Sequence, residues 1–271
     1  MIFPLFAAAR TTLQSESRTV SRTMEKALAT RPEVTLASVQ RDFAEWRKGR
    51  THYAVWAIDV DTPALRAASA AMREHLADCL LPDYRRQAHV TLHLCGFPAA
   101  VSNLDDDYPA AILQEQIAAL QAGAPPPFTL EIGPPGSFTS ATYFSVDDCS
   151  DGIHIARRAL AGSRNPDAIF PYTPHVTYGL YRGAFPLPAL MQRMAACDTG
   201  PSMRLNIDRL TLMVYEAAII GGSLSGLCEF DLATRQIKRL DPTLMETLFG
   251  RHQTDESSCP PADPAISTAV V

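Results

Sequence analysis

The sequence predicts an α+β fold that consists of two pseudo-symmetric lobes. A strand, a helix, a loop and a second strand follow one another between residues 53 and 95, and the same order returns from residue 142 onward. The second strand of each unit carries the same phrase, His-Val-Thr, at positions 89–91 and 175–177. Two long copies are too few for a solenoid, so we interpret them as an internal duplication within one domain.

Each element of the two units has its own signal. The run from residue 53 to 60 is rich in aromatic and β-branched residues, which is typical of a strand. Thr62 and Pro63 suit the N-cap and the first position of the helix that follows. The second unit has a strand over residues 142–146 and a short helix over residues 151–160 before its motif strand.

We expect the chain to divide into three parts. Residues 1–50 form an N-terminal helical extension, and apolar residues at helical spacing predict an amphipathic helix over residues 35–48 within it. Residues 51–240 form the main domain with the two duplicated lobes. Residues 241–271 form a short helix and a disordered tail rich in Ser, Pro, Ala and Asp.

Two further stretches allow a more specific prediction. Residues 205–214 predict one strong strand whose apolar phase changes at Asp208-Arg209, which indicates a bulge there. Three consecutive aspartates at 105–107 precede a predicted helix, and negative charge at that place complements the helix N-terminus. Neighbouring side chains diverge, so we do not expect these aspartates to form a metal site.

Composition limits the class of protein. The chain has 271 residues with 46% hydrophobic and 20% charged residues, which is typical of a folded domain. Its net charge of −5 argues mildly against a broad basic surface for long nucleic acids. Six scattered cysteines without a Cys-x-x-Cys pair favour free thiols in a reducing compartment. Since the chain also lacks an apolar run of roughly 20 residues, we expect a cytoplasmic monomer without membrane contact.

The two motifs carry the candidate chemistry. Side chains alternate along a strand, so His89 and Thr91 share one face, as do His175 and Thr177. Two imidazoles that face one phosphate can serve as general base and general acid, each for about 10²–10⁴-fold in rate. The two threonine hydroxyls can bind phosphate oxygens, and this chemistry requires no metal and no cofactor. A lone strand histidine is more often a core or surface residue, but two copies in matching positions favour catalysis.

Other side chains are weaker candidates. Arg86 and Arg182 are close to the motifs in sequence and can bind phosphate, although solvated arginines at strand ends are the more common case. Tyr178 can stack on a base if it faces the groove, and a place in the strand core is equally compatible with the sequence. His93 is predicted to lie on the same strand face as His89, and we expect it to support the site or to face solvent rather than to take part in catalysis or bind a metal.

The paired motif resembles the 2H phosphoesterase superfamily, and in particular the bacterial 2′-5′ RNA ligase and 2′,3′-cyclic phosphodiesterase proteins. The resemblance rests on Ala-His-Val-Thr-Leu-His-Leu at 88–94 and Pro-His-Val-Thr-Tyr-Gly-Leu at 174–180, and it covers about residues 52–232. It implies two antiparallel sheets that face a central groove, with helices outside. It also implies metal-independent chemistry on 2′,3′-cyclic phosphates or 2′-5′ linkages, with roles for His89, Thr91, His175 and Thr177.

Three functions therefore remain open. The first is a phosphoesterase whose partner is an RNA end or a small nucleotide with a cyclic phosphate. The second keeps this chemistry but hydrolyses a small cyclic nucleotide or oligonucleotide signal. The third is a non-catalytic module with the same fold that binds RNA or nucleotides.

Overall fold

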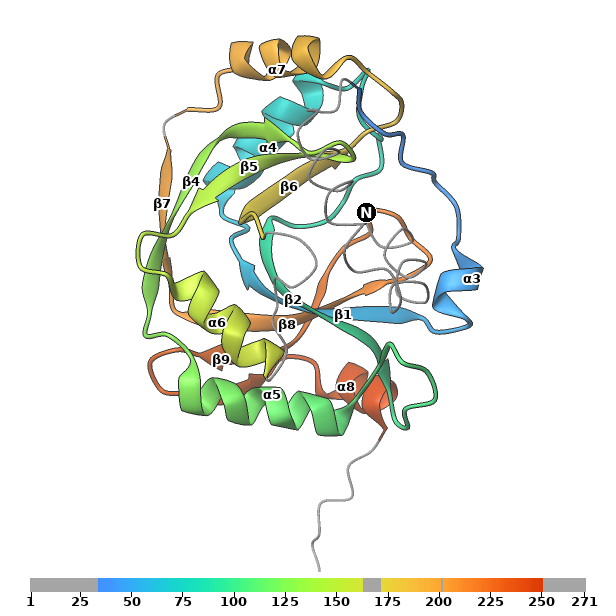
Figure 1. Cartoon of the computed structure of the whole chain (residues 1–271), viewed down its shortest axis with the longest axis vertical. Coiled ribbons are helices and arrows are strands. Elements are labelled where there is room, and N and C mark those ends of the chain that lie inside the picture. The colour runs from blue at the N-terminus through green and yellow to red at the C-terminus, as the bar shows by residue number, and fades with distance from the viewer. Residues whose placement is uncertain (1–33, 163–171, 201, 251–271) are drawn as a thin grey trace, which may run out of the picture.

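The computed structural model describes residues 34–162, 172–200 and 202–250, which form two sheets with helices around them (Figure 1). This architecture confirms the predicted α+β class and the strand–helix–strand units. The first unit is β1, α4 and β2, and the second is β5, α6 and β6. The predicted helices before residue 34 and the predicted tail from residue 253 lie outside the described ranges.

The larger sheet has six strands in the order β10-β9-β8-β1-β2-β3. All neighbours are antiparallel except β2 and β3, which are parallel over a short stretch at the end of β2. The strands are β1 (His52–Asp59), β2 (His89–Ala99), β3 (Asp107–Pro109), β8 (Arg209–Glu216), β9 (Ser225–Asp231) and β10 (Ile237–Arg239).

The smaller sheet has four antiparallel strands in the order β6-β5-β4-β7. They are β4 (Phe128–Ser137), β5 (Ala141–Asp147), β6 (His175–Leu180) and β7 (Met203–Ile207). The motif strand β6 is therefore an edge strand of its sheet.

The helices lie around the two sheets (Figure 1). α4 begins as predicted, because the Thr62 hydroxyl accepts a hydrogen bond from the backbone of Leu65 and Pro63 occupies the first turn. α8 ends the described chain and buries Phe249 against the ring of Tyr108. The helices are α3 (Ala44–Arg47), α4 (Pro63–His75), α5 (Ala110–Gly123), α6 (Gly152–Ala161), α7 (Leu187–Ala196) and α8 (Pro242–Phe249).

One polar network lies inside the apolar core. The side-chain oxygen of Gln116 on α5 accepts hydrogen bonds from the Trp56 indole at 2.9 Å and from the Tyr108 hydroxyl at 2.6 Å. The Gln116 amide in turn donates to the Leu160 carbonyl of α6. Each of these groups would lose water on folding, so the network satisfies them and fixes how α5 and α6 sit on β1.

The phase change at Asp208 has a different cause from the predicted bulge. Residues 203–207 form β7 in the four-stranded sheet, whereas residues 209–216 form β8 in the six-stranded sheet. The chain crosses from one lobe to the other at this residue, and the buried face changes with it. The prediction of a single bulged strand is therefore wrong.

The predicted amphipathic helix over residues 35–48 is also wrong in the described part. Residues 34–42 are not helical, and only the single-turn helix α3 follows. The backbone of Thr35 donates to Phe185, and that of Ser38 donates to Tyr181, so this segment binds the loop after β6 instead of forming its own helix. Leu36 is half exposed, so the apolar residues at helical spacing in this segment do not mark the buried face of a helix.

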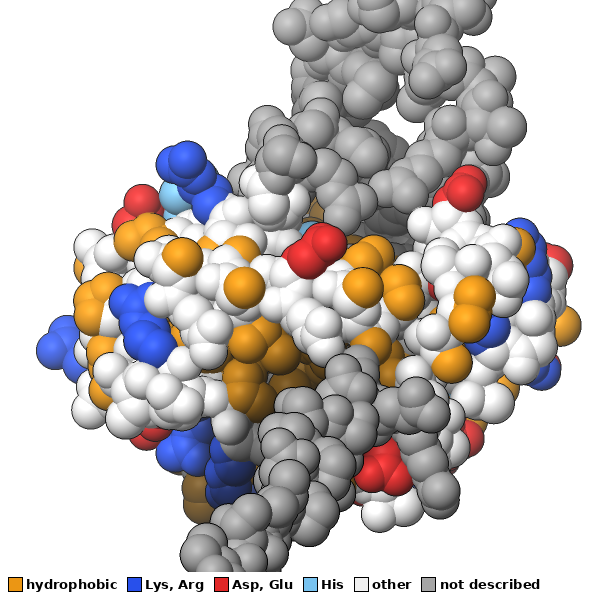
Figure 2. Space-filling model, turned by 90° about the horizontal axis from the view of Figure 1, so that it is seen from below, with side chains coloured by type: hydrophobic (Ala, Val, Ile, Leu, Met, Phe, Trp, Pro, Cys, Tyr) orange, Lys and Arg blue, Asp and Glu red, His pale blue; other side chains and the backbone are white. Residues whose placement is uncertain are grey.

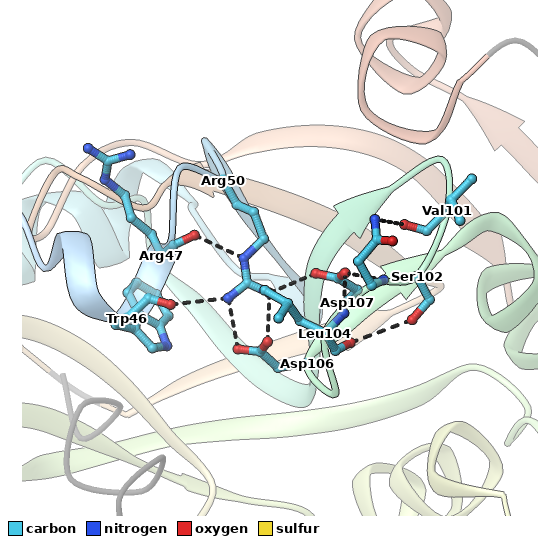
Figure 3. A network of polar contacts seen from close by, with 9 residues as sticks. Trp46, Arg47, Arg50, Val101, Ser102, Leu104, Asp106 and Asp107 are labelled. Atoms are coloured by element: carbon cyan, nitrogen blue, oxygen red, sulfur yellow. Dashed lines mark hydrogen bonds and ion pairs between the residues drawn. The ribbon is translucent and has the colours of Figure 1, made fainter.

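The aspartates at 106 and 107 bind an arginine instead of completing a helix N-terminus. The Arg50 guanidinium donates to Asp106 at 2.6 Å and to Asp107 at 2.7 Å (Figure 3). It also lies 3.6 Å above the Phe97 ring. Gly96 makes this approach possible, since it has φ +121° and a Cβ there would lie 2.3 Å from the Asp106 carbonyl oxygen. The cluster ties α3 to the end of β2.

Candidate active site

Both motifs occupy the first residues of their strands, and in each strand the histidine and the threonine lie on the face opposite to the core. Val90 and Val176 are fully buried in the main core, so the side chains on either side of them face the other way. His89 and Thr91 share that opposite face of β2, and His175 and Thr177 share that of β6. The predicted arrangement of the two phrases on their strands is confirmed.

The two motif strands match each other in register. Thr91 pairs with Ala57 on β1, and Thr177 pairs with Tyr143 on β5. In each strand the residue immediately after the threonine has no partner, because the pairing skips one position there. Both motif strands therefore have a bulge at the same position, so the repeated sequence also has a repeated backbone geometry.

The two motifs lie near each other across the lobes. The Tyr172 hydroxyl donates a hydrogen bond to the Thr91 carbonyl at 2.7 Å, and the Tyr84 hydroxyl donates to the Thr177 carbonyl at 3.2 Å. The charge of His175 also lowers the pKa of His89, so the two imidazoles are within electrostatic reach. The structure thus brings together the four residues that the repeat singled out.

Each imidazole is held in one tautomer. The His89 Nδ1 lies 2.8 Å from the Gln87 carbonyl oxygen, and the His175 Nδ1 lies 2.7 Å from the Thr173 carbonyl oxygen. A carbonyl oxygen can only accept, so Nδ1 carries the proton in both rings. In the neutral ring, Nε2 then has a free lone pair, and in the charged ring it carries a proton to donate.

Burial lowers both histidine pKa values. His89 is 8% exposed, and burial together with the nearby Arg86 charge lowers its pKa from 6.5 to about 4, against a smaller opposite effect of the Gln87 hydrogen bond. Burial also lowers the pKa of the partly exposed His175, opposed by its bond to Thr173. Both rings are therefore held toward the neutral form, and His89 lies next to a fixed positive charge.

The threonine hydroxyls are available to a ligand. Thr91 and Thr177 are both partly exposed, and within the described ranges neither hydroxyl has a hydrogen-bond partner. A hydroxyl can donate to an anionic oxygen at this position without first breaking a protein contact. Both hydroxyls are therefore free to contact a bound ligand.

Two aromatic rings that sequence reasoning missed lie against His175. The Phe138 ring is 4.8 Å from the imidazole at 83°, and the Tyr143 ring is 5.7 Å from it at 66°. The two aromatic rings stack on each other at 4.3 Å, and both residues are partly exposed. Tyr143 could have been found as the residue opposite Thr177, whereas the turn that carries Phe138 has no recognisable signal.

The three weaker candidates fall in different places. Arg86 lies near His89, where its side chain donates to the Gly222 carbonyl and lies 4.0 Å above the Tyr215 ring. Arg182 is exposed beyond the far end of β6, about 20 Å of extended chain from His175, so the structure does not bring it to the motifs.

Tyr178 is a correction to the site. It is 1% exposed, it packs on Phe144 at 4.7 Å, and it lies in the core. Strand alternation places Tyr178 on the same core face as Val176, so the structure shows the core position and not a stacking position at the motif.

The described part of the chain contains neither a cluster of metal ligands nor a membrane-spanning helix. No three His, Cys, Asp or Glu side chains in residues 34–162, 172–200 and 202–250 gather so that they could hold a metal ion. In the same ranges, no helix has the length and apolarity needed to cross a bilayer.

Residues 60–218 match the sequence profile of the 2′-5′ RNA ligase superfamily. The chain belongs to this superfamily. The match spans more than half of the chain and includes both motifs, which confirms the resemblance seen in them. No curated protein matches the chain.

The chain also resembles solved structures, at low sequence identity. E. coli LigT complexed with 3′-AMP is 18% identical at a TM-score of 0.43, and the alignment covers 67% of this chain and 98% of LigT. E. coli LigT complexed with ATP has the same identity and coverage at a TM-score of 0.40. TT0787 of Thermus thermophilus is 17% identical at a TM-score of 0.43, with 67% of this chain and 98% of TT0787 covered.

Proposed function

We propose that this protein is a phosphoesterase that acts on a 2′,3′-cyclic phosphate or a 2′-5′ phosphodiester of RNA or nucleotides. The observation that carries the proposal is that His89 and His175 have the same tautomer and the same backbone hydrogen bond. Both rings donate from Nδ1 to a backbone carbonyl two residues earlier, and both keep Nε2 for a substrate. One reaction needs one base and one acid, and two such imidazoles supply both.

The reaction on a cyclic phosphate would proceed in one displacement. A water molecule attacks phosphorus while one Nε2 accepts its proton. The bond from phosphorus to one ribose oxygen breaks, and the other imidazole donates its Nε2 proton to that oxygen. The Thr91 and Thr177 hydroxyls donate to the non-bridging oxygens, where negative charge increases in the transition state. The product is a phosphomonoester beside a free ribose hydroxyl.

The surroundings of the two rings favour different roles. Burial and, to a smaller extent, the Arg86 charge lower the pKa of His89 to about 4, so His89 stays neutral and acts as the base. His175 is more exposed than His89, and the Arg86 charge is not among the causes that lower its pKa, so His175 accepts a proton more readily and acts as the acid. A bound phosphate anion favours protonation of this imidazole further.

The same surroundings favour a nucleotide as substrate. Phe138 and Tyr143 provide a partly exposed aromatic surface on which a base can stack beside the phosphate site. The Arg86 guanidinium supplies a positive charge near His89. The aromatic pair thus extends the site beyond one phosphate group.

A small substrate is the second candidate within this chemistry. On the face shown in Figure 2, the Lys and Arg side chains of the described residues are scattered and alternate with acidic and apolar ones. The net charge of the chain is −5. Long nucleic acids bind mainly through their phosphates, so the negative net charge favours a cyclic nucleotide or short oligonucleotide over a long RNA.

The proposal is tested with 2′,3′-cyclic nucleotides in the presence of EDTA. We expect turnover by the wild type and a loss of at least about 100-fold in kcat for His89→Ala and for His175→Ala. The exposed His154 provides a matched control, since His154→Ala should retain full activity. Turnover that requires added metal would contradict the mechanism. No turnover of any cyclic phosphate or 2′-5′ dinucleotide would instead favour a binding module.

A further inference from the structure

Two tyrosines connect the lobes at the motifs themselves. Tyr84 belongs to the segment that leads into β2, five residues before His89, yet its hydroxyl binds the carbonyl of Thr177 on β6. Tyr172 belongs to the segment that leads into β6, three residues before His175, yet its hydroxyl binds the carbonyl of Thr91 on β2. We propose that these bridging tyrosines are positioning residues that set the distance between the two catalytic histidines. The inference rests on the proposed function.

The place of the motif strands explains why such a bridge is needed. β6 is an edge strand, and β2 around Thr91 has a strand partner on one side only, since β3 pairs only with Phe97–Ala99. No strand ladder joins β2 to β6 in the described chain, although the two strands contact each other. The phenols thus form hydrogen bonds between two sheets that share no strand pairing at this point, in addition to the hydrogen bond from Arg157 on α6 to the Leu92 carbonyl on β2.

Each bridging tyrosine is itself held in place. The Tyr84 ring packs on Gly221, where a Cβ would lie 2.9 Å from the ring, and burial raises the pKa of Tyr84 so that its hydroxyl remains a donor. The Arg157 guanidinium lies 3.6 Å above the Tyr172 ring and donates to the Leu92 carbonyl at 2.7 Å. Both phenols are therefore oriented by groups outside the motifs.

The reciprocal connection has a specific consequence for catalysis. Each hydrogen bond ends on the backbone of a threonine whose hydroxyl faces the substrate, and that threonine is two residues from its histidine. A shift of one motif strand relative to the other would move the base, the acid and both hydroxyls out of line with one phosphate. Misplacement of about 1 Å can cost about 100-fold in rate.

The test compares Tyr84→Phe and Tyr172→Phe with Tyr108→Phe. The control removes a phenol that also donates a buried hydrogen bond, to Gln116, but away from the motifs. For cyclic nucleotide hydrolysis, we expect kcat to fall between about 10- and 100-fold in the two test variants, with KM changed by less than about threefold. Tyr108→Phe should retain kcat even though its unfolding midpoint in urea decreases.

A second measurement does not depend on turnover. NMR titration of the imidazoles in the free protein should show altered titration of both His89 and His175 in each test variant, and unchanged titration in Tyr108→Phe. If the wild type hydrolyses no cyclic phosphate, the proposed function fails, and the titration alone decides on the bridge. Test variants that match Tyr108→Phe in kcat and in both titrations would overturn the inference.

Discussion

Acid should destabilise this protein through His89. The ring is 8% exposed, and burial with the Arg86 charge lowers its pKa from 6.5 to about 4. In the unfolded chain His89 takes up a proton near pH 6.5, whereas in the folded protein it does so only near pH 4. The contribution of neutral His89 to the free energy of unfolding is therefore complete above pH 6.5 and is lost as the pH falls through 4. At 1.36 kcal/mol per pKa unit, this loss amounts to about 3 kcal/mol.

The perturbation is His89→Asn, whose amide can still donate to the Gln87 carbonyl but does not titrate. Urea unfolding between about pH 7 and pH 4 gives the free energy of unfolding of each protein. Carboxylates that lose stability in acid contribute to both curves, so the difference isolates His89. We expect the wild type to lose about 3 kcal/mol more than the variant, and the exposed His154→Asn control to follow the wild type. Equal losses in wild type and His89→Asn would refute the reasoning.

Three other substitutions test other parts of the structure. Arg86→Gln removes the charge that lowers the pKa of His89, so the acid limb of kcat/KM should move to higher pH in a pH–rate series. Gln116→Leu leaves two buried donors unpaired and should lower the urea unfolding free energy by about 2–5 kcal/mol. Gly96→Ala places a Cβ 2.3 Å from the Asp106 carbonyl at a positive φ, and calorimetry should show a loss of about 2 kcal/mol or more.

The sequence was sufficient for the parts of the site that local periodicity determines. Strand alternation alone placed His89 with Thr91 and His175 with Thr177, and the buried Val90 and Val176 confirm it. The repeated order of strand and helix predicted two related lobes. Both inferences depend only on residues that are neighbours in the chain.

Features that depend on distant contacts could not be predicted. The apolar spacing from Leu36 to Trp46 suits a helix, but the backbone there binds the loop after β6, and only one helical turn forms. Strand content predicted one strand across Asp208, although the chain changes sheets at that residue. A strand pattern gives no information about which sheet its next residue joins.

The aromatic and phenolic parts of the site were missed for the same reason. Phe138 reaches His175 across a turn, and the two bridging tyrosines bind carbonyls 81 and 93 residues away. Tyr178 adjoins its motif in sequence, but strand alternation places it on the core face together with Val176. Proximity in sequence was therefore a poor guide to the candidate site beyond the four motif residues.

The pH dependence of kcat/KM on a 2′,3′-cyclic nucleotide tests the central claim most directly. Two histidines with opposite protonation requirements predict a bell-shaped pH–rate profile. The acid limb should lie near the His89 pKa of about 4. The alkaline limb should lie below pH 6.5, because burial lowers the pKa of His175 from that ordinary value. His175→Ala should abolish the alkaline limb in the residual activity. A wild-type rate that depends on a single ionisation, or a complete bell in His175→Ala, would contradict catalysis by the histidine pair.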